Sequence, residues 1–210
     1  METILIADDH EIVRRGVRTI IESFPKKYNC IEAATCAEVI QLLNTERIHY
    51  AVLDMFLADG IFFNAIRQMT EQNHRTSILV YSMNSEKIYA RRLMQKGVKG
   101  FLSKKSNIGE LEIAIQCLLN GEVYLSKSLK DTIFRANNPD VLASPIDLLS
   151  DRELEVIEYM ATGMGAKEIA QKTNLDITTI STYRRRAFEK LEVDNMIELK
   201  DKFMFHKLQR

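Results

Sequence analysis

The composition is that of a globular chain without net charge. The sequence has 210 residues, 46% hydrophobic and 28% charged, which is enough for one domain of typical size and a smaller second one. Lysine plus arginine number 29, and so do aspartate plus glutamate. This balance excludes a nucleic-acid binder that relies on overall positive charge, so any such surface must be local.

Neither a membrane segment nor a disulfide framework is indicated. Two carboxylates follow a very short apolar run at the N-terminus, which does not fit a signal peptide. No apolar run approaches the length of about 18 residues that a membrane helix needs. The three cysteines are scattered and lack a CxxC spacing, which speaks against disulfides and a zinc site. We expect a cytoplasmic protein that makes no membrane contact.

Short apolar runs alternate with helical periodicity from residue 3 to about 120. The expected strands cover 4–7, 30–34, 50–54, 77–81 and 99–103. Between them apolar residues recur at helical spacing, as in Ile12, Gly16, Ile20 and Phe24. This alternation predicts a doubly wound, five-stranded parallel sheet with helices on both faces and ligands at the carboxyl ends of its strands.

Two domains and a linker are expected. Segment 126–147 is polar, holds two of the three prolines and has no sustained period, which is typical of a linker. It separates an α/β domain over 1–125 from a second domain over 148–210. The second domain has no strand signal and four helical stretches, so we expect it to be small and all-α.

Three carboxylates lie at the ends of expected strands. Asp8 and Asp9 follow the first strand and Asp54 ends the third. These strands are adjacent in a doubly wound sheet, so the carboxylates converge, and a divalent cation relieves their repulsion. Mg²⁺ suits such a site because it binds carboxylate, water and phosphate oxygens. Taken singly, each acid equally fits the cap of the following helix.

A hydroxyl and an ammonium group complete the set. Ser82 follows the fourth strand and Lys104 the fifth. Around one aspartate, these groups and a metal supply the positioning and charge neutralisation that phosphoryl transfer needs, with Asp54 as nucleophile. Singly, Ser82 fits a turn and Lys104 a solvated charge. Their joint placement at strand ends favours phosphoryl chemistry.

A helix-turn-helix is expected in the second domain. Ser150 and Glu153 form a capping box, a second helix covers about 166–173, and Asp176 is placed to cap a third. The outer face of the third helix presents hydroxyl and guanidinium groups, which contact bases and phosphates in the major groove. They are Thr178, Ser181, Thr182, Arg185 and Arg186, with Arg184 at one edge. On a helix without such a context, these arginines would more often form a solvated face. The turn and the helix caps around them favour a DNA-binding role instead.

Residues 1–125 resemble a receiver domain of two-component signalling, which has a flavodoxin-like fold. The resemblance rests on ILIADDHEIVRRG, VLDM and ILVYSMNSEKIYARRLMQKGVKGFLSKKS. It implies that Mg²⁺ is held by Asp9, Asp54 and the backbone carbonyl of Phe56, with Asp8 in support. It also implies that a partner histidine kinase phosphorylates Asp54.

The same resemblance implies a switch. Ser82 would move toward the phosphate, Lys104 would pair with it, and Phe101 would swing inward. The loop over 54–60 is shorter than is usual in the family and lacks its Met-Pro pair. We hypothesise that Phe56 shields the acyl phosphate from water.

The second domain is similar to the LuxR-type helix-turn-helix, as in response regulators of the NarL and FixJ branch. The carrying motifs are Leu-Ser-x-Arg-Glu at 149–153, Lys-Glu-Ile-Ala at 167–170 and Thr-Ile-Ser-Thr-Tyr-Arg at 179–184. The resemblance implies that bases are read by Ser181, Thr182 and Arg185, and that phosphates are held by Lys167, Thr179 and Arg184. Many relatives carry lysine at the position of Ser181, so the operator sequence does not carry over.

The last expected helix, 195–207, bears an apolar stripe that includes Ile197 and Phe203. The resemblance implies that it pairs two copies on an inverted-repeat operator; alternatively, the stripe covers its own domain. The chain is then a phosphorylation-controlled transcription regulator and no metabolic enzyme. A phosphate-independent DNA binder with a relic receiver is the alternative. An Mg²⁺-dependent aspartyl-phosphate hydrolase is less favoured, because such an enzyme usually has a second acid near the nucleophile and a cap for its substrate, whereas a short apolar loop follows Asp54. No Walker loop, HExxH or GxSxG motif of other enzyme classes occurs either.

Overall fold

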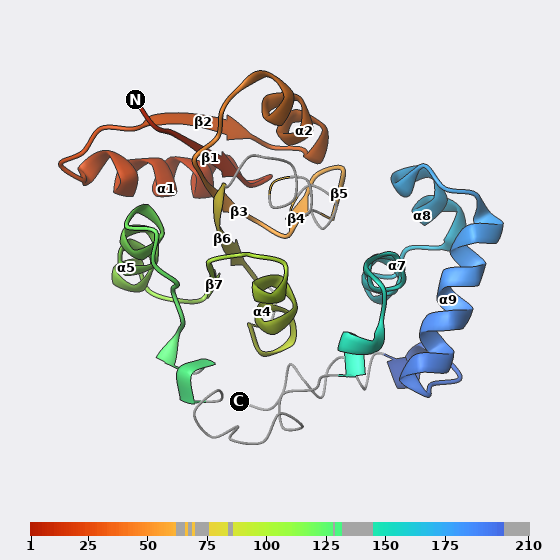
Figure 1. Ribbon diagram of the computed structural model, residues 1–210. Helices are drawn as coiled ribbons and strands as arrows, with labels where there is room; N and C mark the ends of the chain where they lie inside the picture. Colours follow the sequence, from red (N-terminus) through yellow and green to blue (C-terminus); the bar gives the residue numbers. More distant parts are fainter. Residues whose placement is uncertain are drawn as a thin grey trace. The chain divides into compact units, whose positions relative to one another are not determined.

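The structure is a computed structural model that describes residues 1–61, 66, 69, 76–83, 86–127, 129–131 and 145–199. The chain divides into two units, Met1–Phe134 and Arg135–Arg210, which are described separately (Figure 1). Most of the expected linker lies outside the described residues. Within the described ranges, no helix is long and apolar enough to cross a membrane.

Five parallel strands form the sheet of the first unit. They are β1 (Thr3–Ala7), β2 (Asn29–Ala33), β3 (Tyr50–Leu53), β6 (Ser77–Ser82) and β7 (Gly100–Ser103). Their order is β2-β1-β3-β6-β7, and every neighbouring pair is parallel. The expected doubly wound sheet is confirmed. Because the order reverses beside β1, the carboxyl ends of β1 and β3 lie at the point where this fold binds ligands.

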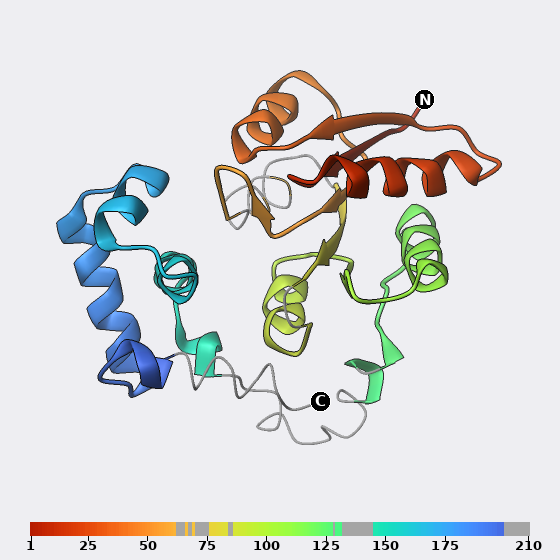
Figure 2. The ribbon, with the colours of Figure 1, turned by 180° about the vertical axis from the view of Figure 1, so that it is seen from behind.

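Helices cover both faces of the sheet. The helices α1 (Glu11–Ser23) and α5 (Ile108–Leu119) lie on one face, while α2 (Cys36–Thr45) and α4 (Glu86–Gln95) lie on the other (Figure 1 and, from behind, Figure 2). Between α1, α5 and the strands, the buried core joins residues such as Ile6, Val52 and Leu102 to Ile21 and Ile115.

The buried face of α1 differs from the expected stripe. The helix buries Val17, Ile20 and Ile21, whereas Ile12 is 77% exposed and Gly16 is exposed. The sequence of α1 offers two overlapping stripes with helical spacing, and the branched Val17 fills the core where the side-chain-less Gly16 cannot.

A short hairpin follows β3 and was not expected. The strands β4 (Phe56–Leu57) and β5 (Gly60–Ile61) pair antiparallel, with Ala58 and Asp59 as the turn. The shortened loop after Asp54 is therefore ordered by its own backbone pairing.

The chain that leaves α5 is bound to the edge of the sheet. The backbone N–H of Tyr124 donates to the carbonyl of Lys99 (2.9 Å), and Tyr124 forms a parallel bridge with Gly100. A Cβ at Gly100 would lie 3.0 Å from Leu79 Cδ1 and 3.0 Å from Tyr124 Cβ. This close approach requires glycine.

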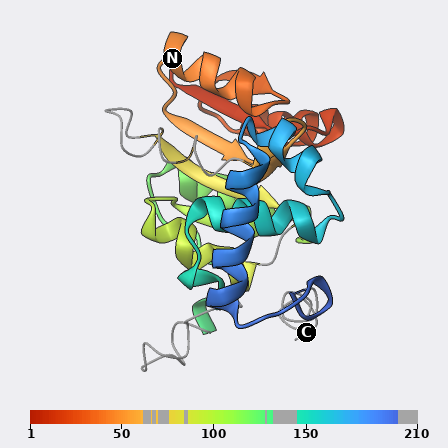
Figure 3. The same cartoon turned by 90° about the vertical axis from the view of Figure 1, so that its right-hand side faces the viewer.

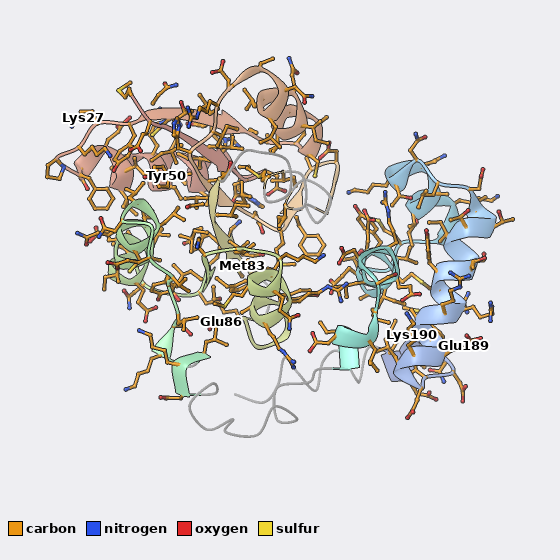
Figure 4. The ribbon with its side chains drawn as sticks, viewed as in Figure 1. Lys27, Tyr50, Met83, Glu86, Glu189 and Lys190 are labelled. Atoms are coloured by element: carbon orange, nitrogen blue, oxygen red, sulfur yellow. The ribbon has the colours of Figure 1, made fainter. Side chains whose placement is uncertain are left out.

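A second contact follows two residues later. The Ser126 hydroxyl donates to Glu86 Oε2 (2.6 Å), and its oxygen accepts from the backbone N–H of Leu129 (3.1 Å). Burial raises the pKa of Glu86, an effect that the Ser126 hydrogen bonds only partly offset. Glu86 is the first residue of α4 (Figure 4), so the chain is held to both β7 and α4.

The second unit consists of helices throughout its described part. They are the 3-10 turn η2 (Pro145–Leu148), α7 (Asp151–Ala161), α8 (Ala166–Thr173) and α9 (Ile177–Leu191). Residues 196–199 are also helical; the remainder of the last expected helix, with Phe203, lies outside the described residues. The long helix α9 packs against both α7 and α8, and α7 crosses it (Figure 3).

Helix caps place these elements where the sequence predicted. The capping box is confirmed: Ser150 Oγ accepts from the Glu153 N–H (3.2 Å), and Glu153 Oε2 accepts from the Ser150 N–H (2.8 Å). Asp176 is the N-cap of α9, but its side chain makes no capping hydrogen bond, contrary to expectation. Asn174 ends α8 in the left-handed conformation, with φ 54°.

We expect opposite effects from alanine at two glycines. Gly100→Ala crowds Leu79 and Tyr124 and should lower the free energy of unfolding by about 1–3 kcal/mol. Gly16→Ala, in the interior of α1 with no atom within 4 Å of the added Cβ, should raise it by about 0.5–1 kcal/mol. Urea unfolding measures both. A Gly100→Ala variant as stable as wild type would contradict the close approach.

Candidate functional site

A lysine lies between two buried carboxylates at the carboxyl edge of the sheet. Lys104 Nζ is 2.6 Å from Asp8 Oδ2 and 2.6 Å from Asp54 Oδ2. Asp8 is 2% and Asp54 7% exposed. Burial lowers the pKa of Lys104, but its hydrogen bonds to Asp54 and Asp8 outweigh this and raise the pKa above its ordinary value. The ammonium is therefore charged and compensates both carboxylates.

Backbone hydrogen bonds across the sheet bring these side chains together. The Asp54 N–H donates to the carbonyl of Ala7 (2.8 Å), and the Lys104 N–H donates to that of Ser82 (2.9 Å). Ser82, the last residue of β6, is 1% exposed. Strands β1, β3, β6 and β7 thus end at one edge, as the sequence predicted.

Phe101 is completely buried in β7. Side chains alternate along a strand, so Phe101 points to the sheet face opposite to that of Leu102, which belongs to the α1 and α5 core. The aromatic ring is therefore directed inward, on the face of the sheet that α2 and α4 cover.

A second group adjoins the carboxylates. His10 Nδ1 is 2.6 Å from Asp9 Oδ1 and 3.4 Å from Asp8 Oδ1. One ligand atom from each of Asp8, Asp9 and His10 lies within 4.8 Å of the others, a spacing that fits a metal ion. Asp8 belongs to both groups. Sequence reasoning missed His10, although its position directly after two aspartates was a visible signal.

The hairpin after Asp54 is held at both ends. The Phe56 N–H donates to Asp54 Oδ1 (3.3 Å). At the turn, Asp59 accepts from the backbone N–H groups of Cys36 (2.5 Å) and Ala37 (3.0 Å), at the start of α2. Burial would raise the pKa of Asp59, but these hydrogen bonds lower it. Asp59 was not foreseen; the roles of the Phe56 carbonyl and ring stay predictions.

The candidate DNA-contacting residues are displayed on α8 and α9. The exposed ones are Lys167, Thr178, Ser181, Arg184, Arg185 and Arg186, whereas Thr179 and Thr182 are partly exposed. The opposite side of α9 buries Ile180, Ala187 and Leu191, as expected. Two hydroxyls are oriented within the helix: Ser181 donates to the Ile177 carbonyl and Thr182 to that of Thr178, both at 2.9 Å.

Neighbouring side chains hold the arginines and the end of α9. The Arg184 guanidinium lies 5.2 Å from the centre of the Phe188 ring, and Arg185 pairs with Glu189 (2.5 Å). Lys190 turns to the capping box and contacts Glu153 Oε2 at 2.7 Å (Figure 4). Burial would raise the pKa of Glu153, but the Lys190 contact and the cap lower it.

Comparison with known proteins assigns both units. Residues 4–116 match the response regulator receiver domain. The chain belongs to the response regulator family. Residues 147–203 match the bacterial regulatory proteins of the luxR family, so this response regulator carries a LuxR-type domain. The site described above lies in the receiver domain, and α8 and α9 lie in the LuxR-type domain.

Relatives cover nearly the whole chain. The response regulator UvrY of Escherichia coli is 28% identical over 201 residues, which are 95% of this chain and 92% of UvrY. A Pseudomonas aeruginosa protein is 31% identical over 99% of this chain and 100% of its own. A structure of RcsB from Salmonella typhimurium aligns with a TM-score of 0.76 at 25% identity, covering 98% of this chain and 99% of that one.

Another RcsB structure was determined on the promoter P1flhDC with the phosphomimetic BeF3-. It aligns with a TM-score of 0.72 at 28% identity and covers 96% of this chain and 98% of that chain. The fold therefore corresponds to that of the RcsB response regulator over most of the chain.

We expect the ion pairs of Lys104 to stabilise the receiver domain. Lys104→Ala leaves Asp8 and Asp54 without their ammonium partner and should lower the free energy of unfolding by about 1–3 kcal/mol in the absence of added metal. The matched control is Lys105→Ala, at the exposed neighbouring residue, which should stay within about 0.5 kcal/mol of wild type. Equal stabilities of the two variants in urea unfolding would refute this.

Proposed function

We propose that phosphorylation of Asp54 controls DNA binding and transcription by this response regulator. The observation that carries the proposal is the contact of Lys104 with both Asp54 and Asp8. An oxygen of Asp54 attacks the phosphorus of a phosphohistidine on a partner kinase. The new P–O bond forms as the P–N bond breaks, the electron pair of that bond stays on the nitrogen, and the ring leaves as neutral imidazole because its other nitrogen already carries a proton. Lys104 then neutralises charge on the acyl phosphate.

Mg²⁺ is the proposed cofactor. Asp9, Asp54 and the carbonyl of Phe56 would bind it, with Asp8 in support. Asp8 and Asp9 each bring a carboxylate oxygen within 4.8 Å of the other and of a His10 ring nitrogen, and carboxylate oxygens suit a hard divalent cation. When bound, the ion would offset the negative charge of the incoming phosphoryl group. The protein's own part is to hold these oxygens and Lys104 in place before the phosphoryl group arrives.

Ser82 and Phe101 are the proposed switch residues. Ser82 ends the strand next to β7, and its carbonyl is bound to the Lys104 N–H. A movement of the Ser82 hydroxyl toward the phosphate would therefore shift the paired strands β6 and β7, and β7 also carries Phe101. The local gain of charge would bias the packing of β6, β7 and α4.

The output is proposed to be sequence-specific DNA binding in the cytoplasm. Ser181, Thr182 and Arg185 of α9 would read bases, while Arg184 and Lys167 would hold phosphates. Relatives of known structure support this, because RcsB is described as dimers bound to DNA. We infer that two copies bind an inverted repeat, since a two-fold dimer presents two equivalent recognition helices.

Phosphorylation is tested by intact mass after incubation with Mg²⁺ and acetyl phosphate. Wild type should gain the mass of one phosphoryl group, and Asp54→Asn none, because the amide is not nucleophilic. Asp59→Asn is the matched control: it changes a nearby acid that caps α2 and should leave the mass gain intact.

The same samples are then assayed for DNA binding. Tighter binding by phosphorylated wild type, and not by Asp54→Asn, is the expected result. DNA binding without any mass gain would contradict the phosphorylation switch and leave a phosphate-independent regulator.

Different effects are expected from the arginines of α9. Arg184→Ala removes a phosphate contact and should reduce the slope of log affinity against log salt by about 1 for all sequences. Arg185→Ala should instead relax discrimination between operator variants by about 1–3 kcal/mol. Lys27→Ala, an exposed lysine of the first unit (Figure 4), is the charge-matched control. Identical behaviour of all three variants would exclude α9 as the recognition helix.

A further inference from the structure

Arg14 connects strand β2 to the acidic pocket, by which we mean the site formed by Asp8, Asp9 and Asp54 at the carboxyl edge of the sheet. It lies in the first turn of α1, and its side chain is 15% exposed. Its Nη1 donates to the backbone carbonyl of Asp8 (2.8 Å), and its Nε donates to Glu32 Oε2 on β2 (3.0 Å). One guanidinium thus joins β2 to the residue at which β1 passes into the pocket.

Glu32 is the anchor of this connection. Its second oxygen, Oε1, accepts from Arg18 Nε (2.7 Å), and Arg18 also donates to the carbonyl of Cys30 (3.1 Å). Burial would raise the pKa of Glu32, but the hydrogen bonds of Arg18 and Arg14 lower it below its ordinary value. Glu32 is therefore charged, and both of its oxygens are bound.

The bond from Arg14 completes the restraint of Asp8. The Asp8 N–H donates to the carbonyl of Ala33 (3.1 Å), and Asp8 Oδ1 accepts from the His10 N–H (3.0 Å). With its carbonyl held as well, the peptide plane between Asp8 and Asp9 has a fixed orientation. That orientation sets the direction of both carboxylates.

We propose that Arg14, anchored by Glu32, is a positioning residue that fixes the main chain at Asp8 and so holds Asp8 and Asp9 in the geometry that binds a divalent cation. The inference rests on the proposed Mg²⁺-dependent function. Arg14 acts through a backbone carbonyl, and its charge is paired with Glu32. Its effect is therefore one of geometry, unlike that of Lys104, which contacts the carboxylates themselves.

Arg18 provides an internal control. It binds the same Glu32 from the same helix, one turn further along, and makes no contact with Asp8 among the hydrogen bonds described. If these arginines only attach α1 to β2, the loss of either should have the same consequence. If Arg14 positions the main chain at Asp8, the loss of Arg14 should lower the affinity for Mg²⁺ and the loss of Arg18 should not.

The test is calorimetric titration of the full-length protein with Mg²⁺, comparing Arg14→Ala, Arg14→Lys and Arg18→Ala with wild type. Removal of a residue that orients a metal ligand without binding the metal typically lowers metal affinity by about 10–100-fold. Arg14→Ala should therefore weaken Mg²⁺ binding by about ten-fold. Arg14→Lys keeps the charge but lacks the planar fork, and it should weaken binding nearly as much. Arg18→Ala should bind as wild type does.

A second readout separates metal affinity from chemistry. The rate of phosphorylation by acetyl phosphate should require more Mg²⁺ in Arg14→Ala, yet approach the wild-type rate at saturation. Should Arg14→Ala fail to fold by circular dichroism, Arg14→Lys carries the same test, because its aliphatic stem retains the packing.

The outcomes are distinct. Equal weakening by Arg14→Ala and Arg18→Ala would overturn the inference in favour of a purely structural role. Wild-type affinity in Arg14→Lys would show that charge, not geometry, matters. If wild type itself neither binds Mg²⁺ nor gains a phosphoryl group, the proposed function fails, and the inference fails with it.

Discussion

The organising constraint of the receiver domain is the enforced meeting of like charges. The parallel register of β1 and β3 places Asp8 and Asp54 at one edge, where both are buried. Two carboxylates so placed are unfavourable unless a cation lies between them. Lys104 meets this need at 2.6 Å from each. In the proposed function, a dianionic phosphoryl group at Asp54 would compete with Asp8 for the ammonium of Lys104, and the contacts of the unphosphorylated site would have to rearrange.

The fold could largely be predicted from the sequence, because the buried strands are short continuous apolar runs and the helices between them have helical apolar spacing. The observed strand ends differ from the expected ones by no more than one residue, and the predicted capping box of α7 is present. The expected stripe of α1 was correct for Ile20, which is buried, and not for Ile12 and Gly16, which are exposed, because two apolar stripes overlap and only packing against the sheet decides between them. The β4–β5 hairpin escaped because strands of two residues carry no periodicity.

The candidate site was predictable in its principal members and not in its supporting ones. Asp54 and Lys104 stand at strand ends, where the topology alone brings them together. Asp59 accepts from backbone N–H groups at the start of α2, and Glu32 binds the Arg14 side chain that donates to the Asp8 carbonyl. Such partners have no fixed spacing in sequence. Side chains that hold the main chain of the site from other elements are therefore the part that the sequence alone does not predict.

The contacts of Tyr124 and Ser126 bind the start of the expected linker to the first unit. The polar composition placed its start at residue 126, yet the chain there is still bonded to β7 and α4. A shift of α4 would therefore act directly on the chain at Ser126, through the hydrogen bond from the Ser126 hydroxyl to Glu86.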